Sequence, residues 1–338
     1  MLFCIYSFIK KKSIRKEGCA MELFKRFEGN PILTKMDFPD DWFKRHGWTP
    51  HTVFNAGVGD RDGLTLLFVR VEDRQGISRL VCFCSEDGRT NWEIDEDTIF
   101  TGEEREEGYG VEDPRLTWID TLREWAIVYT HYSIYGPLVS IATTESFKRF
   151  NYLGNVLPPE NKDAALFPEP INGYWWLIHR PESGGKQIWI AKSKCTNSGR
   201  EDLRNWEGHR VLIPTDGTPR WDGNHIGLNA PPLKTDRGWL LLYHGVKCTP
   251  AGNLYRLGLS MLSLDDPTKV THRTKEFVMS PQGSIDFIGD VGGAIFPCGW
   301  RVHDDGDLRL YYGAADSVMC YARASLIKVI DRVLKDPV

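Results

Sequence analysis

The sequence predicts an all-β fold, a five-bladed β-propeller, from two observations. Long amphipathic helical patterns are nearly absent from the 338 residues, and short β-rich runs end at Gly, Asp, Asn or Pro turns. Five runs also share one plan: a turn residue, then apolar or aromatic residues, then a polar cluster. They start about 50 to 70 residues apart, which is the length of one four-stranded sheet with its loops. The runs are Gly63–Arg70, Glu124–His131, Gly173–Arg180, Gly238–His244 and Asp307–Asp316.

Partner strands follow several of these runs, at Ser78–Cys84, Gln187–Lys192 and Leu257–Leu264. Radial repetition of such units protects sheet edges, so we expect residues 21–338 to form a single propeller domain. A sandwich with irregular insertions is the alternative that the repeat leaves open. In a propeller, equivalent strand ends converge on one mouth of the central channel. The polar residues expected at that mouth are Arg70, Glu72, Asp73, His131, His179, Arg180, His244 and Asp316.

The first twenty residues do not fit the propeller pattern. The apolar run Leu2–Ile9 precedes Lys10–Lys12, whereas a secretory signal carries its charges first. The run is also too short to span a bilayer. Met21 opens a segment that reads like an ordinary start, so we expect residues 1–20 to be an extension, either disordered or wrongly assigned to the protein.

The composition is that of a soluble globular protein, with 41% hydrophobic and 26% charged residues. A net charge of -4 gives no basic field for nucleic acid or an acidic membrane. Cys82 and Cys84 are separated by one residue, a spacing that suits neither a disulfide between them nor a CxxC metal pair. We therefore expect reduced thiols and a cytoplasmic protein. The histidines lack metal-ligand spacing such as HxH or HExxH, so no metal is expected.

Two clusters carry candidate chemistry. The segment Gly110–Arg115 places Glu112 and Asp113 before a proline that restricts the backbone. A rigidly held carboxylic acid can protonate a glycosidic oxygen, although the local string alone favours an ordinary Asp-Pro turn. The second cluster is cationic and would form an anion clamp beside that acid. Its members are Arg70, Lys162, Arg180 and Lys234.

Ten strings resemble glycoside hydrolase family 130, whose members are β-mannoside phosphorylases on a five-bladed propeller. They are VFNAGV, VRVED, GVEDPR, KDAALFPE, HRP, WDGNHIG, APPLKT, GWLLLYHGV, YRLG and YYGAADS, in the family's order, and the resemblance covers roughly residues 24–325. It implies an inverting phosphorolysis of β-linked mannosides that gives α-mannose 1-phosphate. Inorganic phosphate would be the co-substrate, without a cofactor.

The resemblance also implies roles for single residues. Asp113 matches the general acid, which in part of the family acts through the sugar's 3-hydroxyl. The residues expected to bind sugar are Asn55, Arg70, Asp73, Glu112 and Asp316. Those expected to bind phosphate are Lys162, Arg180, Lys234, Tyr243 and His244. Asn229 and His225 depart from the family pattern, and we expect the Asn229 loop to border the leaving-group side.

Two other functions stay open. An inverting β-mannoside hydrolase needs a second carboxylate that activates water, whereas a phosphorylase needs cations that hold its anionic nucleophile. The candidate bases are Asp73, Glu112, Asp163, Glu169, Asp222 and Asp290. A non-catalytic glycan-binding propeller would instead keep Asp113 in a structural ion pair outside the pocket. The sequence leaves the linkage (β-1,2 or β-1,4), the leaving sugar and a homo-oligomeric state open.

Overall fold

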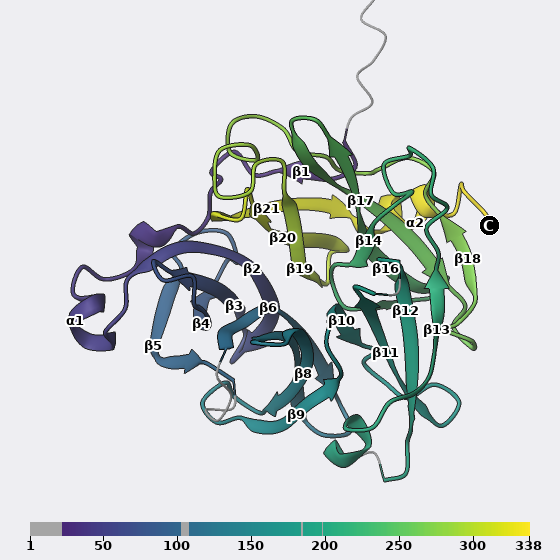
Figure 1. Ribbon diagram of the computed structural model, residues 1–338, viewed down its shortest axis with the longest axis horizontal. Coiled ribbons are helices and arrows are strands. Elements are labelled where there is room, and N and C mark those ends of the chain that lie inside the picture. Colours follow the sequence, from purple (N-terminus) through teal and green to yellow (C-terminus); the bar gives the residue numbers. More distant parts are fainter. Residues whose placement is uncertain (1–21, 103–107, 184, 198) are drawn as a thin grey trace, which may run out of the picture.

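The computed structural model describes residues 22–102, 108–183, 185–197 and 199–338, so the predicted extension at residues 1–20 lies outside the described residues. Five blades of antiparallel strands follow one another around a common centre (Figure 1), and one parallel pair, Ser78 with Gly110, links the first two blades. Blade 1 holds β2 (Pro50–Arg61), β3 (Leu64–Asp73), β4 (Ser78–Ser85) and β5 (Glu93–Phe100). Blade 2 holds β6 (Gly108–Ile119), β7 (Glu124–Ser133), β8 (Gly136–Thr144) and β9 (Asn151–Leu157). Blade 3 holds β10 (Asn161–Leu166), β11 (Tyr174–Pro181), β12 (Ile188–Lys194) and β13 (Glu207–Ile213).

Blade 4 has a divided first strand. Its members are β14 (Ile226–Leu228), β15 (Leu233–Thr235), β16 (Gly238–Thr249), β17 (Gly252–Leu262) and β18 (Val270–Arg273). Both β14 and β15 pair with β16, and the gap between them contains Pro231 and Pro232. Proline has no N–H to donate to the ladder, which explains the interruption.

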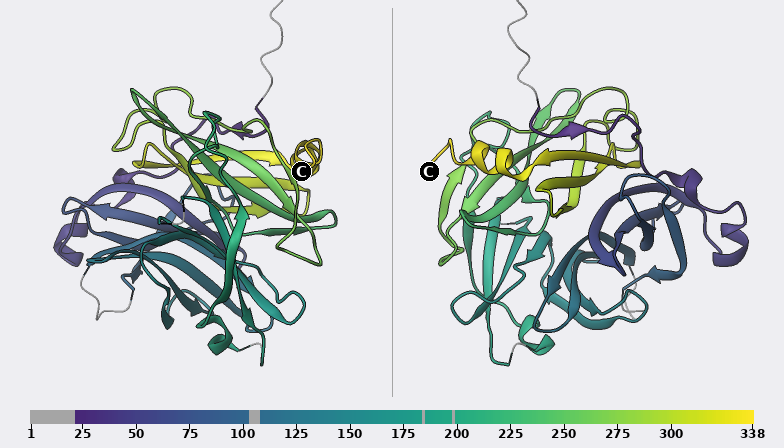
Figure 2. Two further views of the ribbon diagram at one scale, coloured as in Figure 1. Left: turned by 45° about the vertical axis from the view of Figure 1, so that its right-hand side comes forward. Right: turned by 180° about the vertical axis from the view of Figure 1, so that it is seen from behind.

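Blade 5 is completed by a strand from the N-terminal part of the chain. It holds β19 (Ile295–Val302), β20 (Asp307–Ala314), β21 (Val318–Ser325) and, as its outer strand, β1 (Lys25–Arg26). Lys25 pairs with Arg323 and Arg26 with Ala322, so the N-terminal strand lies along β21, as the view from behind shows (Figure 2). This pairing covers the edge that the last blade would otherwise leave open.

Five hydrophobic clusters close the ring, because each joins one blade to the next. Leu66 and Val111 lie in the cluster between blades 1 and 2, and Ile119 and Leu166 in that between blades 2 and 3. Corresponding clusters join blades 3 and 4 and blades 4 and 5. The last one contacts Val53 of blade 1 and residues of blade 5, which completes the circle. Blades packed on both faces explain why the five predicted runs are continuously apolar.

The five runs are the second strands of the blades, namely β3, β7, β11, β16 and β20. The predicted propeller is therefore confirmed, and the sandwich alternative is wrong. The helices are few and peripheral: α1 (Trp42–His46), the 3-10 turns at Lys35–Asp37 and Arg200–Leu203, and α2 (Leu326–Val333). Val329 and Val333 of α2 are buried against the cluster between blades 4 and 5. Among the described residues, no helix has the length and apolar character needed to cross a membrane.

The first strands of blades 1, 2 and 3 lie nearest the centre and share a local distortion (Figure 1). Asn55, Asp113 and Asp163 have φ angles of 50°, 49° and 53°, each at a register shift in its strand. A left-handed residue at such a bulge is rare outside Gly, Asn and Asp, and it re-aims the side chain. Three equivalent bulges thus place three Asx side chains around one channel mouth.

Candidate active site

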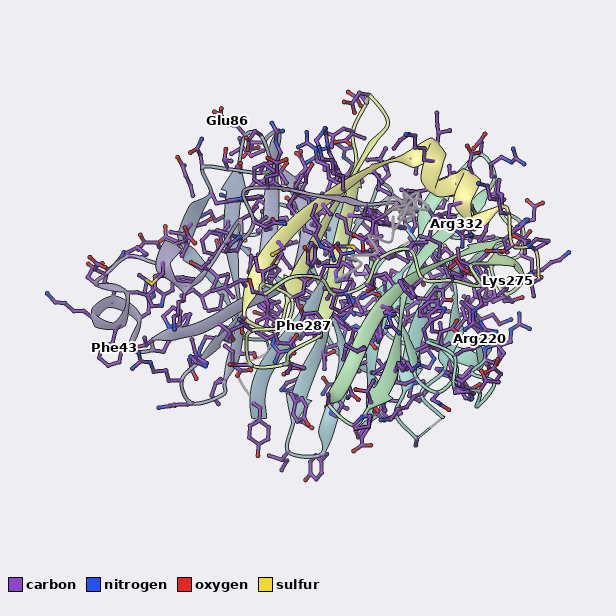
Figure 3. All side chains as sticks on the ribbon, turned by 90° about the horizontal axis from the view of Figure 1, so that it is seen from above. Phe43, Glu86, Arg220, Lys275, Phe287 and Arg332 are labelled. Atoms are coloured by element: carbon purple, nitrogen blue, oxygen red, sulfur yellow. The ribbon has the colours of Figure 1, made fainter. Side chains whose placement is uncertain are left out.

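A cavity of about 130 Å³ lies at this mouth, and all five blades contribute to its lining. The side chains fill the space between the ribbons elsewhere, as the view of all side chains illustrates (Figure 3). The lining residues are Asn55, Arg70, Glu112, Asp113, Lys162, Asp163, Arg180, His225, His244, Tyr255, Ala294, Phe296 and Asp316.

Asp113 is held by two donors from blade 1. Its Oδ1 accepts a hydrogen bond from Asn55 Nδ2 at 2.9 Å and one from Arg70 Nη1 at 3.3 Å. The residue is 8% exposed, and Pro114 follows it. Fixed backbone and fixed carboxylate together give a rigid acid that faces the cavity.

Arg70 is the counterion of the acidic side of the cavity. Its Nη2 donates to Glu112 Oε1 at 2.8 Å and to Glu72 Oε2 at 3.1 Å, and its Nε donates to Ser78 Oγ at 2.9 Å. Burial by itself would lower the pKa of Arg70, but the surrounding carboxylates outweigh it and hold this pKa above its ordinary value. The guanidinium therefore stays charged and orders the acids around it.

Two of those acids have raised pKa values. Burial raises the pKa of Glu112, although Arg70 opposes the shift. Burial also raises the pKa of Asp316 to about 7, against Arg70 and with Asp113 and Glu112 adding repulsion. Burial and the neighbouring like charges therefore let Asp316 keep its proton in part near neutral pH.

The opposite side of the cavity is cationic and is built around Asp163. Arg180 Nε donates to Asp163 Oδ2 at 2.7 Å, and Arg115 Nη2 donates to its Oδ1 at 3.2 Å. Burial would raise the pKa of Asp163, but Arg180 and Arg115 outweigh it and hold this pKa well below its usual range. Lys162 adds a third cation from the residue before Asp163, with its side chain about one-third exposed at 33%. The ionised Asp163 orients the cations.

The histidines and the tyrosine of the cavity are neutral groups. Burial lowers the pKa of His225 to about 4, with Arg180 adding to the shift, and it lowers the pKa of His244 well below its usual range. Burial raises the pKa of Tyr255 to about 12. These side chains can donate or accept hydrogen bonds without adding charge.

Arg115 joins three blades beneath the cavity. Its Nη1 donates to the carbonyl of Asp113 at 2.8 Å, and its Nε donates to the carbonyl of Asn229 at 3.0 Å. Its Nη2 also reaches the carbonyl of Leu228 at 3.2 Å. One buried guanidinium thus fixes the backbone of Asp113 relative to Asp163 and to blade 4.

Comparisons with known proteins agree with this geometry. The family model described as beta-1,4-mannooligosaccharide phosphorylase, of glycoside hydrolase family 130, matches residues 23–335. This chain belongs to glycoside hydrolase family 130.

Its relatives in family 130 include a 1,2-beta-oligomannan phosphorylase of Thermoanaerobacter sp. (strain X514), 35% identical over 87% of this chain and 95% of the relative. A beta-1,4-mannooligosaccharide phosphorylase of Ruminococcus albus is 32% identical over 94% of this chain and 93% of the relative. Among solved structures, the beta-1,2-mannobiose phosphorylase from Listeria innocua, in complex with beta-1,2-mannobiose, matches with a TM-score of 0.81 at 27% identity. The match covers 93% of this chain and 99% of that one.

Within this family 130 chain, the structure brings together most of the residues that the sequence predicted. Asn55, Arg70, Glu112, Asp113 and Asp316 line the acidic side, and Lys162, Arg180 and His244 line or adjoin the cationic side. Three predicted residues, Asp73, Lys234 and Tyr243, lie outside the cavity.

Asp73 serves the turn between β3 and β4. Its Oδ1 accepts from the backbone N–H groups of Gln75 and Ile77 at 2.8 and 3.1 Å, and its Oδ2 accepts from Arg79 at 2.7 Å. Three partners within six residues satisfy the carboxylate locally. The structure therefore places Asp73 in this turn and not in the lining of the cavity.

Lys234 and Tyr243 are displaced for different reasons. Lys234 on β15 pairs in register with Trp239, five residues or about 17 Å along β16 from His244. It is 52% exposed and pairs with Glu169 at 2.5 Å. Tyr243 directly precedes His244, and successive strand residues point to opposite faces. Its hydroxyl donates to Asp222 at 3.0 Å and accepts from Arg273 at 3.1 Å, inside the cluster between blades 3 and 4.

Other residues that we expected at the mouth also lie outside the cavity lining. His131 and His179 do not line the cavity; His179 contacts Asn161 and His209 through its two ring nitrogens. Asn229, expected beside the leaving group, is fully buried and accepts from Arg115 through its carbonyl. Arg220, which bonds Asp222, lies at the periphery of the molecule (Figure 3).

The sequence did not point to Tyr255, Phe296 or Ala294 as cavity residues. It suggested Asp163 only as a candidate base and His225 only as a departure from the family pattern. One signal could have located Asp163: the inner strands of successive blades repeat an Asx residue followed by Ala or Pro, at Asn55, Asp113 and Asp163. Tyr255 and Phe296 carry no such signal, since they stand among many aromatic strand residues. Among the described residues, His, Cys, Asp and Glu form no group of three or more that could hold a metal ion.

Proposed function

We propose that this protein cleaves terminal β-linked mannosides with inorganic phosphate, with inversion, to give α-mannose 1-phosphate and a shortened sugar. The observation that carries the proposal is one small cavity with a rigid acid, Asp113, on one side and the cations Lys162 and Arg180 on the other. The printed activities of the family 130 relatives support it.

Asp113 is the proposed general acid. A phosphate oxygen forms a bond to the anomeric carbon from the α face while the β-glycosidic carbon–oxygen bond breaks. The departing oxygen takes a proton that originates from Asp113, either directly or through the sugar's 3-hydroxyl. In the net reaction, the proton of hydrogen phosphate ends on the released hydroxyl, so atoms and charge balance.

The remaining cavity residues take binding roles in this proposal. Asn55 and Arg70 hold Asp113, while Glu112 and Asp316 meet sugar hydroxyls as acceptors, or as donors when protonated. Lys162 and Arg180 hold the phosphate dianion, with the neutral His244 as a hydrogen-bonding neighbour. Arginine suits this role because its planar guanidinium can bind two phosphate oxygens.

A hydrolase is supported less well. Of the six carboxylates considered as a base, Asp73, Glu169, Asp222 and Asp290 lie outside the cavity lining. Glu112 accepts a hydrogen bond from Arg70, and Asp163 accepts hydrogen bonds from two arginines. Because its pKa is held well below the usual range, Asp163 is a weak base for water. A non-catalytic propeller requires Asp113 outside the cavity, whereas Asp113 lines it.

We also propose that the enzyme acts in the cytoplasm, where buried thiols such as Cys82 and Cys84 remain reduced. A homo-oligomer stays a prediction, which sedimentation analysis would test.

The deciding experiment is product analysis with β-1,2- and β-1,4-linked mannobiose, each with and without inorganic phosphate. We expect phosphate-dependent α-mannose 1-phosphate, reduced by a factor of about 10² to 10⁴ in Asp113→Asn. The preferred disaccharide assigns the linkage. Free mannose formed at the same rate without phosphate would identify a hydrolase and refute the proposal.

A further inference from the structure

Glu182 places a carboxylate of the chain itself among the cations of the cavity. Its Oε1 accepts a hydrogen bond from Arg180 Nη1 at 2.6 Å and lies 4.0 Å from Lys162 Nζ. Its Oε2 lies 3.7 Å from Lys186 Nζ. The backbone N–H of Glu182 donates to the carbonyl of Glu160 at 2.9 Å, which fixes the residue where it stands.

Two of these cations line the proposed phosphate site. Arg180 offers donors on a planar fork, and Nε and Nη1 already serve Asp163 and Glu182. A phosphate oxygen that approaches Nη1 therefore meets a position that a carboxylate occupies. The side chain of Glu182 is 19% exposed, so water screens its charge only in part.

Glu182 is ionised under ordinary conditions. Burial would raise its pKa, but Arg180 and Lys162 outweigh burial and lower it. Its negative charge opposes a second anion at the same cations, and the opposition is greater for a dianion than for a monoanion.

We propose that Glu182 is an internal competitor of phosphate, which weakens phosphate binding and thereby sets the phosphate concentration at which the enzyme works. This inference rests on the proposed function, since it assigns a residue that tunes the same site. Asp163 differs from Glu182, because Asp163 accepts hydrogen bonds from both Arg180 and Arg115 and so orients the two guanidinium groups.

The test is Glu182→Gln, which preserves shape and an acceptor oxygen but removes the charge. Calorimetric titration with inorganic phosphate requires no turnover. It therefore measures phosphate binding whether or not the enzyme is a phosphorylase. We expect binding tighter by about threefold to tenfold, which corresponds to about 0.7 to 1.4 kcal/mol. The gain should be larger at about pH 8 than at about pH 6, because phosphate carries more negative charge at the higher pH. In turnover, the KM for phosphate should fall by a similar factor.

Glu169→Gln is the matched control. It removes a carboxylate that pairs with a lysine, Lys234, outside the cavity, and it should leave phosphate binding unchanged. Unchanged or weaker binding in Glu182→Gln would overturn the inference and make Glu182 a residue that positions Arg180. If neither the wild type nor the variants bound phosphate, both this inference and the proposed phosphorolysis would be refuted. Loss of phosphate-independent mannose release in Glu182→Gln would instead identify Glu182 as a hydrolytic base.

Discussion

Asp163→Asn separates the role that the structure gives Asp163 from that of a catalytic base. The substitution removes the charge between Arg115 and Arg180, whose side chains are 1% and 2% exposed. Breaking a buried ion pair by removing one partner costs about 3 to 5 kcal/mol. Asparagine accepts the left-handed φ of 53° as readily as aspartate, so backbone strain adds nothing. At about 2 cal/mol/K per residue, the unfolding entropy of a chain of this size converts this loss into about 4 to 7 °C in Tm.

Thermal unfolding followed by circular dichroism measures this loss. The folded pKa of Asp163 is depressed, so its stabilisation is present above the ordinary Asp pKa and disappears as pH falls through the folded value. The difference in Tm should therefore persist at neutral pH and shrink only in strong acid. Asp290→Asn is the control, because the Asp290 side chain is 46% exposed and its carboxylate lies 3.4 Å from the half-exposed His51. A Tm of Asp163→Asn within about 1 °C of wild type at neutral pH would refute the assignment of Asp163 as the counterion of both arginines.

Three further predictions test other parts of the site. Lys162→Met should raise the KM for phosphate by about tenfold, whereas Lys234→Met should leave it unchanged, since Lys234 pairs with a surface glutamate; initial rates at varied phosphate decide this. Asp316 has a raised folded pKa, so its contribution to stability is complete below the ordinary value of 3.8 and is lost as pH rises through about 7. Asp316→Asn should therefore flatten the dependence of Tm on pH in this range, and an unchanged slope would contradict the shift. Tyr243→Phe should cost about 1 to 3 kcal/mol by leaving Asp222 and Arg273 short of a partner, with an unchanged phosphate KM; denaturant melts and kinetics show whether both hold.

The fold was more accessible from the sequence than the site was. Continuously apolar strand runs, bounded by turns and repeated five times, are local features that can be read from the sequence. Strand β1 at Lys25–Arg26, which completes blade 5, carries no such signal, because two residues are too few to show a pattern. Its partner, β21, lies at the other end of the chain.

The site residues divide along the same line. Asp113 was singled out because the GVEDPR string resembles family 130, since the local Asp-Pro string alone favours an ordinary turn. Lys234 could not be excluded, because its distance from His244 depends on how β14 and β15 divide the partner strand. Asp73 and Asp113 look equally plausible in the sequence, and only the turn hydrogen bonds remove Asp73.

The sequence by itself determined that strands dominate, that five similar units follow one another, and that an acid and several cations stand near strand ends. Those features depend on the order and the side-chain types of residues that are close together in the sequence. The tertiary structure alone decided which side chains meet. Asn55 reaches Asp113 across 58 residues, and Arg115 reaches Asn229 across 114. Closing the ring brings these distant groups together, because only the packing of five blades positions their inner strands around one channel.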